Sequence, residues 1–214
     1  MKKAIIIVGM GQGLSMGMAI KFGKEGYLIG MISRSEDKLR NYQQTLDTLG
    51  IQSFYSKADV GDEYQLEEAL VSLVKQTGEV AVLFYNAVDY RYKNILEESI
   101  EDLTKGFKIS VANVLTALRS LLPQLTKSKG AVLLTGGGSA NFPSPEMASI
   151  SLGKAGIKNL AYQLNAVLKD KSIFVGTVTV SGGINPESAK YSPEKIAEVF
   201  WDLYKKRDQV EVVY

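Results

Sequence analysis

Two residue types are missing from this chain of 214 residues, which contains no cysteine and no histidine. Without cysteine there are no thiol nucleophiles and no disulfides, and without histidine a Ser-His-Asp triad is impossible. Zinc sites of the usual kinds also need these side chains, so we predict no metal site. Acid–base chemistry in this protein must therefore use lysine, tyrosine, serine or carboxylate groups.

The chain also lacks a block of charges of one sign. It has 25 Lys and Arg residues against 23 Asp and Glu residues, and these are spread along its length. Nucleic acids and anionic membranes attract basic patches, so neither is an expected partner. No apolar run is long enough to cross a bilayer, and the start at 1–10 lacks the cleavage site of a secretory signal. We expect a cytoplasmic protein whose partner is a small-molecule substrate.

What the sequence does contain is a regular alternation of short β-rich apolar runs with longer amphipathic stretches. It predicts strands near 4–8, 27–33, 52–56, 80–85, 131–135, 173–180 and 210–213, and helices near 14–25, 36–49, 63–77, 100–126, 147–169 and 193–206. Such alternation is typical of a parallel sheet with helices on both faces. We therefore predict an α/β fold, a single Rossmann-type domain over 1–214 with a doubly wound parallel sheet of about seven strands, whose ligands bind at the carboxyl edge.

The first glycine cluster follows the first predicted strand and opens the first predicted helix. Gly9, Gly11 and Gly13 let a backbone approach a pyrophosphate, and the amides of the helix then meet its charge. The loop lacks the GxxxxGK[ST] pattern of phosphate-transfer proteins. It also fits the nucleotide loop of S-adenosylmethionine-dependent methyltransferases, and a tight turn without any ligand would have the same pattern.

The end of the second predicted strand helps to distinguish between nucleotides. A carboxylate at this point binds the ribose hydroxyls of NAD or of S-adenosylmethionine and repels a 2′-phosphate. This chain has Ser33 and Arg34 there, and both can bind a 2′-phosphate, so NADP(H) is favoured over NAD(H). The alternative is that Arg34 is an ordinary solvated arginine.

Four later stretches follow other predicted strands or open a long helix: KADVGD, LFYNAV, LGKAGI and VTVSGGI. With the glycine loop, in which Gly9, Gly13 and Ser15 take the places of GxxxGxG, their order and spacing resemble the short-chain dehydrogenase/reductase family over essentially the whole chain. The resemblance implies a Rossmann fold, a nicotinamide cofactor and oxidoreductase activity. The cofactor-binding residues that we expect are Gly9, Gly11, Gln12, Gly13, Leu14, Ser33, Arg34, Asp59, Val60, Asn86, Ala87, Lys154, Ser181, Gly182 and Ile184.

The departures from the family all fall on its catalytic residues. In the YxxxK motif the tyrosine lies four residues before the lysine, and here Ile150 occupies that position ahead of Lys154. The positions of the family's catalytic serine and helix asparagine fall near Gly137 and at Ser110. Loss of a positioned general acid costs about 10²–10⁴ in rate, so we expect cofactor binding to survive better than turnover.

Other hydroxyl groups lie near the expected site. Ser151 precedes Lys154 by three residues, hence on a similar face of one helix, and Ser139 follows the fifth predicted strand. We name Lys154, Ser139 and Ser151 as the catalytic residues, although each serine can equally cap a helix or shape a turn. Tyr90 and Tyr92, in the loop after the fourth strand, are further proton-donor candidates.

Three functions fit the sequence. The resemblance favours an atypical NADP(H)-dependent reductase of a small carbonyl compound. The missing tyrosine suits a cofactor-binding sensor or subunit without turnover, and the glycine loop alone suits a methyltransferase.

The substrate-binding side of the chain is short, because only residues 184–192 separate the Gly-Gly turn from the last helix. The family often assembles through its two long helices, so we expect a homo-oligomer, a dimer or tetramer. The apolar stripe in KNLAYQLNAVL either pairs across a two-fold axis or faces the sheet.

Overall fold

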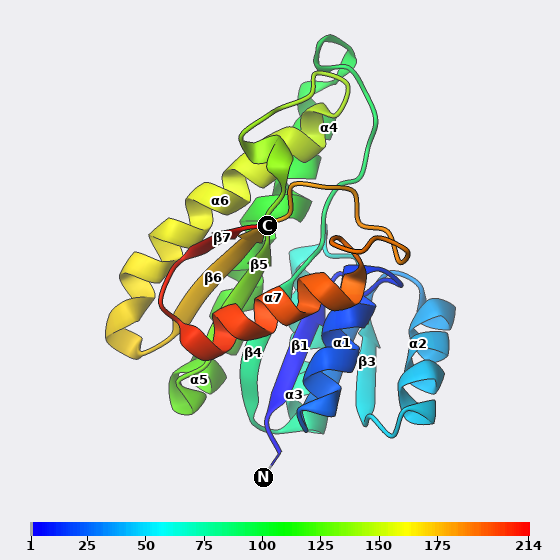
Figure 1. Ribbon diagram of the computed structural model, residues 1–214, viewed down its shortest axis with the longest axis vertical. Coiled ribbons are helices and arrows are strands. Elements are labelled where there is room, and N and C mark those ends of the chain that lie inside the picture. Colours follow the sequence, from blue (N-terminus) through cyan, green and yellow to red (C-terminus); the bar gives the residue numbers. More distant parts are fainter. Residues whose placement is uncertain (1) are drawn as a thin grey trace.

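The computed structural model describes residues 2–214, which form a seven-stranded parallel sheet with helices on both faces (Figure 1). The strands are β1 (Ala4–Val8), β2 (Leu28–Ser33), β3 (Ser53–Lys57), β4 (Val80–Tyr85), β5 (Ala131–Thr135), β6 (Phe174–Thr179) and β7 (Glu211–Val213). Their order in the sheet is β3-β2-β1-β4-β5-β6-β7. The predicted doubly wound fold is confirmed, and the switch in strand order lies between β1 and β4.

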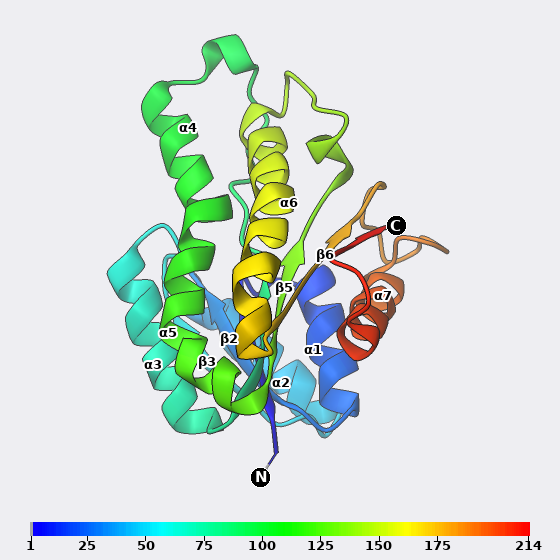
Figure 2. The same ribbon diagram turned by 90° about the vertical axis from the view of Figure 1, so that its left-hand side faces the viewer.

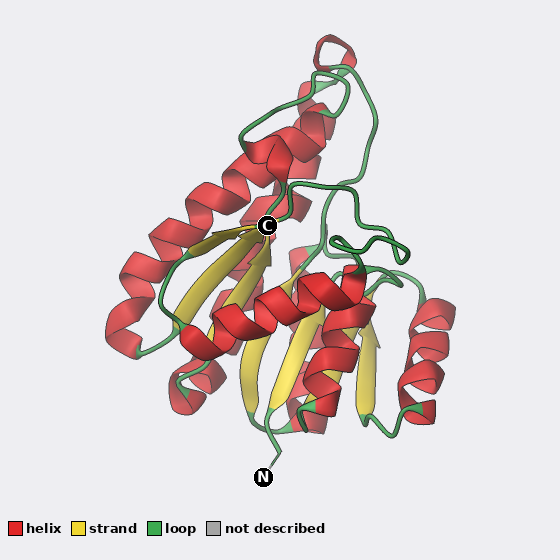
Figure 3. Ribbon diagram, in the orientation of Figure 1, coloured by secondary structure: helices red, strands yellow, loops and turns green. Residues whose placement is uncertain are grey.

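Seven α-helices connect the strands of the described chain: α1 (Leu14–Lys24), α2 (Glu36–Thr48), α3 (Glu63–Thr77), α4 (Ile100–Phe107), α5 (Asn113–Ser128), α6 (Ala148–Leu168) and α7 (Pro193–Lys206). Figure 2 shows α1 and α7 on one side of the sheet and α3, α5 and α6 on the other, and Figure 3 shows the same layers by element type. Between residues 2 and 214, no helix has the length and apolar character needed to cross a membrane.

The helix predicted over 100–126 is interrupted in the structure. A π-helical segment, η2 (Lys108–Ala112), separates α4 from α5. Within it, the carbonyl of Ile109 accepts a 2.6 Å hydrogen bond from the hydroxyl of Tyr85 at the end of β4. Because the chain stays helical through a π segment, the sequence pattern predicts one helix here. The interruption fastens this helix to the carboxyl edge of the sheet.

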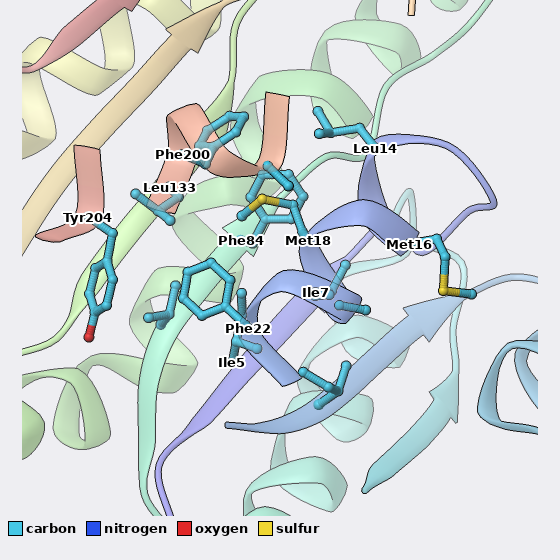
Figure 4. Close-up of a cluster of buried hydrophobic side chains, with 14 of the residues drawn as sticks. Ile5, Ile7, Leu14, Met16, Met18, Phe22, Phe84, Leu133, Phe200 and Tyr204 are labelled. Carbon is cyan, nitrogen blue, oxygen red and sulfur yellow. The ribbon is translucent and has the colours of Figure 1, made fainter. Parts of the chain in front are cut away.

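One face of the sheet packs against α1, α2 and α7. Phe22 of α1, Phe84 of β4 and Phe200 of α7 are fully buried in this layer (Figure 4). The rings of Phe84 and Phe200 meet edge to face with centroids 5.2 Å apart, an arrangement that adds about 0.5–1.5 kcal/mol to the burial of their area. This core holds α1, and with it the glycine loop, over β1.

The other face of the sheet packs against α3, α5 and α6. Ala161 and Leu164, from the apolar stripe of α6, are buried in this core. The stripe therefore faces the sheet, which decides between the two alternatives that the sequence left open. A different set of apolar side chains on the same helix remains 48–67% exposed: Leu152, Tyr162 and Val167.

Candidate functional site

Two adjoining cavities open at the carboxyl edge of the sheet, where the strand order switches. The first, of about 510 Å³, is lined by the loops after β1, β2, β3 and β4, and the second, of about 780 Å³, by α6 and the loops after β1, β4, β5 and β6. They share Gly11, Asn86, Val88 and Tyr90, so they form one continuous cleft. Cavities of this size typically hold small ligands, and the position is the one that the fold predicts.

The glycine loop forms one wall of both cavities. Gly9 has a φ angle of +89°, and a Cβ atom on it would lie 2.5 Å from the backbone nitrogen of Ala87. A Cβ atom on Gly11 or Gly13 would meet nothing within 4 Å. Gly13 immediately precedes α1, and among the described residues no side chain caps this end and no acidic residue lies in its first turn. Free amides beside open space fit the pyrophosphate of a dinucleotide.

Ser15, which replaces the last glycine of the family motif, joins this loop to β4. Its hydroxyl donates to the carbonyl of Gly9 and accepts from the amide of Asn86, each at 2.8 Å. Ser15 is 1% exposed, so these two bonds replace its lost contacts with water. Ser15 thus links the glycine loop to Asn86, the residue that follows β4.

The first cavity ends at the loop after β2. Ser33 and Arg34 line it, together with Lys38 and Tyr42 from α2. Glu36, the first residue of α2, points instead toward Arg40, with 3.9 Å between the charged atoms. Lys38 was not recognised in the sequence, although it lies in the first turn of α2, close after Arg34. Nothing in the sequence singled out Tyr42.

The opposite wall of the first cavity is formed by residues from the loops after β3 and β4. Asp59 and Val60 lie there beside Asn86 and Ala87, as the sequence led us to expect. The Asp59 carboxylate accepts a 2.9 Å hydrogen bond from the backbone of Gly61. The side-chain amide of Asn113, buried at the start of α5, donates to the carbonyl of Val60. The start of α5 thus helps to position this wall.

Lys154 enters the second cavity from α6. Its Nζ donates a 2.8 Å hydrogen bond to the carbonyl of Thr135 at the end of β5. Although the residue as a whole is only half-buried, burial of its ammonium group lowers the pKa to about 8, because a low-dielectric environment disfavours the charge. Ile150, one turn earlier, lines the same cavity. The position of the family's tyrosine is therefore apolar.

Two catalytic serines were expected beside Lys154, and the structure brings one of them to the cavity. Ser139 lies in a short 3-10 turn, η3 (Gly138–Ala140), and lines the second cavity with Lys154. The hydroxyl of Ser151 forms hydrogen bonds of 3.2 and 3.4 Å with the backbone of Ser144, outside both cavities.

Gln12 is exposed and also lies outside both cavities. The remaining wall follows β6 and contains Ser181, Gly182 and Ile184, with Leu14 opposite.

Aromatic side chains stand at the rim of the cleft. Tyr90 lines both cavities and is 67% exposed, and its hydroxyl lies 3.0 Å from that of Tyr92. This bond to Tyr92 raises the pKa of Tyr90, which makes it a weaker acid. Phe142, from the loop after η3, lines the second cavity and was not recognised in the sequence. Only the folded loop brings it there.

The fold and the cleft define a Rossmann-type protein with a ligand site at the switch in strand order. A family model described as short chain dehydrogenase matches residues 3–197. The chain belongs to the short-chain dehydrogenase/reductase family, a family of oxidoreductases.

Similar proteins agree with this assignment. A diacetyl reductase that forms (S)-acetoin, from Staphylococcus epidermidis, is 27% identical over 177 residues, which cover 82% of this chain and 69% of that protein. An uncharacterized oxidoreductase of Thermotoga maritima is 25% identical over 182 residues, covering 85% of this chain and 70% of the other. The solved alcohol dehydrogenase of Thermococcus sibiricus, complexed with 5-hydroxy-NADP, has a TM-score of 0.86 at 20% identity, covering 100% of this chain and 96% of that one.

Proposed function

We propose that this protein is an atypical short-chain dehydrogenase/reductase, an NADP(H)-dependent oxidoreductase that acts on a small carbonyl or alcohol substrate. The observation that carries the proposal is the continuous cleft, which has an open glycine loop at its centre, Arg34 at one end and the ammonium of Lys154 at the other. This order of groups along the cleft supports the binding of a dinucleotide.

In this proposal each part of the cleft holds one part of the cofactor. Gly11 and Gly13 hold the pyrophosphate at the start of α1, and Arg34 with Lys38 pairs with the 2′-phosphate. The adenine lies against Asp59 and Val60, and the nicotinamide end lies against Asn86, Ala87, Lys154, Ser181, Gly182 and Ile184. When bound, the nicotinamide supplies the hydride chemistry, and the protein orients it and stabilises developing charge.

The walls of the second cavity support the proposed substrate class. Within residues 2–214, Lys154 is the one charged side chain that lines this cavity. Its lining also includes apolar groups from Phe142, Ile150, Val180 and Ile184. Only the short segment 184–192 lies between the Gly-Gly turn and α7. A small, largely apolar carbonyl compound fits these walls, and the diacetyl reductase among the similar proteins acts on a substrate of this kind.

A second function is carried by one specific observation, the apolar side chain of Ile150 in the position of the family's general acid. Under this alternative the protein is a catalytically impaired NAD(P)(H)-binding protein that serves as a cofactor sensor or a subunit. Cofactor affinity and turnover therefore need separate measurements.

Fluorescence titration with NADPH and with NADH measures the cofactor. We expect NADPH to bind more tightly, and Arg34→Ala or Lys38→Ala to weaken NADPH about 10–100-fold, because hydrogen bonds to charged groups contribute about 1.5–3 kcal/mol. NADH binding should change little. Arg40→Ala is the matched control on α2, since Arg40 lies outside the cavity lining. Equal affinities would refute the preference for NADP(H), and no binding of either nucleotide would refute both functions.

Turnover is tested by NADPH oxidation with a panel of small diketones, ketones and aldehydes. Reduction by the wild-type protein supports the oxidoreductase. The variant Ile150→Tyr restores the family's phenol beside Lys154, and activity that appears only in this variant would identify an impaired enzyme and favour the sensor or subunit.

We further propose that the protein assembles as a homo-oligomer, a dimer or tetramer, in the cytoplasm. The exposed apolar side chains of α6, Leu152, Tyr162 and Val167, support an assembled state, because such side chains gain from burial.

A further inference from the structure

The stem of the Lys154 side chain packs closely against Gly137, near the position of the family's catalytic serine. Gly137 stands near that serine's position, and a Cβ atom on it would lie 3.2, 3.3 and 3.4 Å from Cγ, Cδ and Cε of Lys154. Ordinary carbon contacts are longer, at about 3.5–4.0 Å. The stem of the lysine therefore lies flat across Gly137, and its ammonium ends at the carbonyl of Thr135.

The other polar side chains of the second cavity are poorly suited to donate a proton. The hydroxyl of Ser15 already donates to the backbone of Gly9. Tyr90 stands at the exposed rim and is bonded to Tyr92. Ser139, Thr135 and Ser181 carry aliphatic hydroxyls, which are much weaker acids than an ammonium group. The tyrosine position itself holds the apolar side chain of Ile150.

We propose, on the basis of the proposed reductase function, that Lys154 is itself the proton donor to the substrate oxygen and not only an anchor for the cofactor. A reduced nicotinamide held in the cleft would supply a hydride to the carbonyl carbon, and the electron pair of the C=O π bond would move to the oxygen. That oxygen takes a proton from Nζ, which becomes a neutral amine. The amine recovers a proton from water through the open cleft, while its remaining hydrogens keep the bond to Thr135.

The acidity of Lys154 matches this role. Burial lowers its pKa to about 8, close to the operating pH at which a general acid is most effective. The titratable residues that line the second cavity are Lys154 and Tyr90. Other charged groups on the elements and loops around α6 form ion pairs or are exposed. The ion pairs are Lys158 with Glu211, Asp89 and Asp102 with Arg91, and Lys108 with Glu63. The exposed groups are Glu101, Lys105, Lys169, Asp170 and Lys171.

The first test uses the protein without cofactor. In protein labelled with ¹³C at the lysine Cε, we expect one lysine to titrate near pH 8 and its signal to be absent from Lys154→Arg. Gly137→Ser, which presses on the lysine stem, should move this titration, whereas Lys158→Arg, one turn further along α6, should leave it unchanged. If every lysine titrates near its usual value of 10.5, the proposal is overturned.

The second test compares binding with turnover in the loaded enzyme. Arginine keeps the charge and the hydrogen-bond donors but does not release a proton at these pH values. We therefore expect Lys154→Arg to lower kcat about 10²–10⁴-fold at saturating NADPH, while Lys158→Arg keeps the wild-type value. Wild-type reduction should fall about tenfold per pH unit above the pKa of the donor, and alcohol oxidation should rise toward the same pKa.

The outcomes separate the two proposals. If the wild-type protein binds no NADPH or reduces no carbonyl compound, the proposed function fails and this inference fails with it. If the wild-type protein is active and Lys154→Arg retains its rate and pH profile, the reductase function stands and only the role of Lys154 as proton donor is refuted.

Discussion

Gly9 and Gly11 stand two residues apart in one loop and have different physical roles. Gly9 combines a φ angle of +89° with an approach to the backbone of Ala87 that leaves no room for a Cβ atom. Gly11 has neither constraint, and the open space beside it belongs to the cleft. The fold thus requires the first glycine, whereas the second leaves open space in the cleft.

We expect Gly9→Ala to lower the free energy of unfolding by at least about 2 kcal/mol, because a left-handed alanine costs about 1–2 kcal/mol and the contact with Ala87 adds to this. Gly11→Ala should leave stability unchanged and weaken NADPH binding. Urea denaturation and the fluorescence titration measure the two effects. A stable Gly9→Ala protein, or unchanged NADPH affinity in Gly11→Ala, would contradict these roles.

At the scale of elements, Glu211 fastens α6 to the edge strand β7. Its carboxylate accepts hydrogen bonds from Thr179 at 2.6 Å and Tyr162 at 3.1 Å, and it lies 3.2 Å from the ammonium of Lys158. Burial by itself would raise the pKa of this carboxyl, but the hydrogen bonds from Thr179, Lys158 and Tyr162 lower it below its usual value of 4.5. The helix that carries Lys154 is thereby joined to the sheet at a second point.

A carboxyl whose pKa is lowered by folding stabilises the protein above its unfolded pKa, and this contribution is lost as the pH falls below about 4.5. We expect Glu211→Gln to destabilise the protein by about 1–3 kcal/mol at pH 7. The difference from wild type should shrink in acid. Urea denaturation across this pH range measures it, with the exposed Glu67→Gln as control. A difference that stays constant with pH would refute the ionic role of Glu211.

At the scale of the whole molecule, the two long helical segments, α4 with α5 and α6, lie side by side on one face (Figure 2). Their outer surface carries exposed apolar side chains, among them Ile100 and Phe107 of α4 and Leu152 and Val167 of α6. The core-facing residues of α6 are already buried against the sheet. An oligomer formed through these helices would therefore use the outward set.

We expect light scattering to give the wild-type protein two or four times the mass of one chain. Leu152→Glu and Val167→Glu should each raise the dissociation constant at least about tenfold, because an unpaired charge would be buried in the contact. Val71→Glu on α3 is the matched control, since Val71 is also 49% exposed but lies on another helix. A monomeric wild-type protein would contradict the predicted assembly.

Local patterns in the sequence were sufficient to predict the sheet and much of the cleft. The hydrophobic periodicity and the composition of each segment predicted each strand of the described chain, because buried parallel strands are short continuous apolar runs between amphipathic helices. The residues directly after these strands, such as Gly9, Asp59 and Asn86, then had to meet at the carboxyl edge of the sheet. Their order along the chain carries this information.

Other features depend on contacts between segments far apart in sequence, and only the tertiary structure decided them. Ser151 is near Lys154 in sequence, yet its hydroxyl turns to the backbone of Ser144. Phe142 reaches the cleft only because its loop folds over the second cavity. Lys154 lies across Gly137 because α6 packs beside the end of β5. The sequence by itself determined which kinds of groups reach this edge, whereas three-dimensional packing determined which of them face the cleft, because side-chain direction depends on distant neighbours.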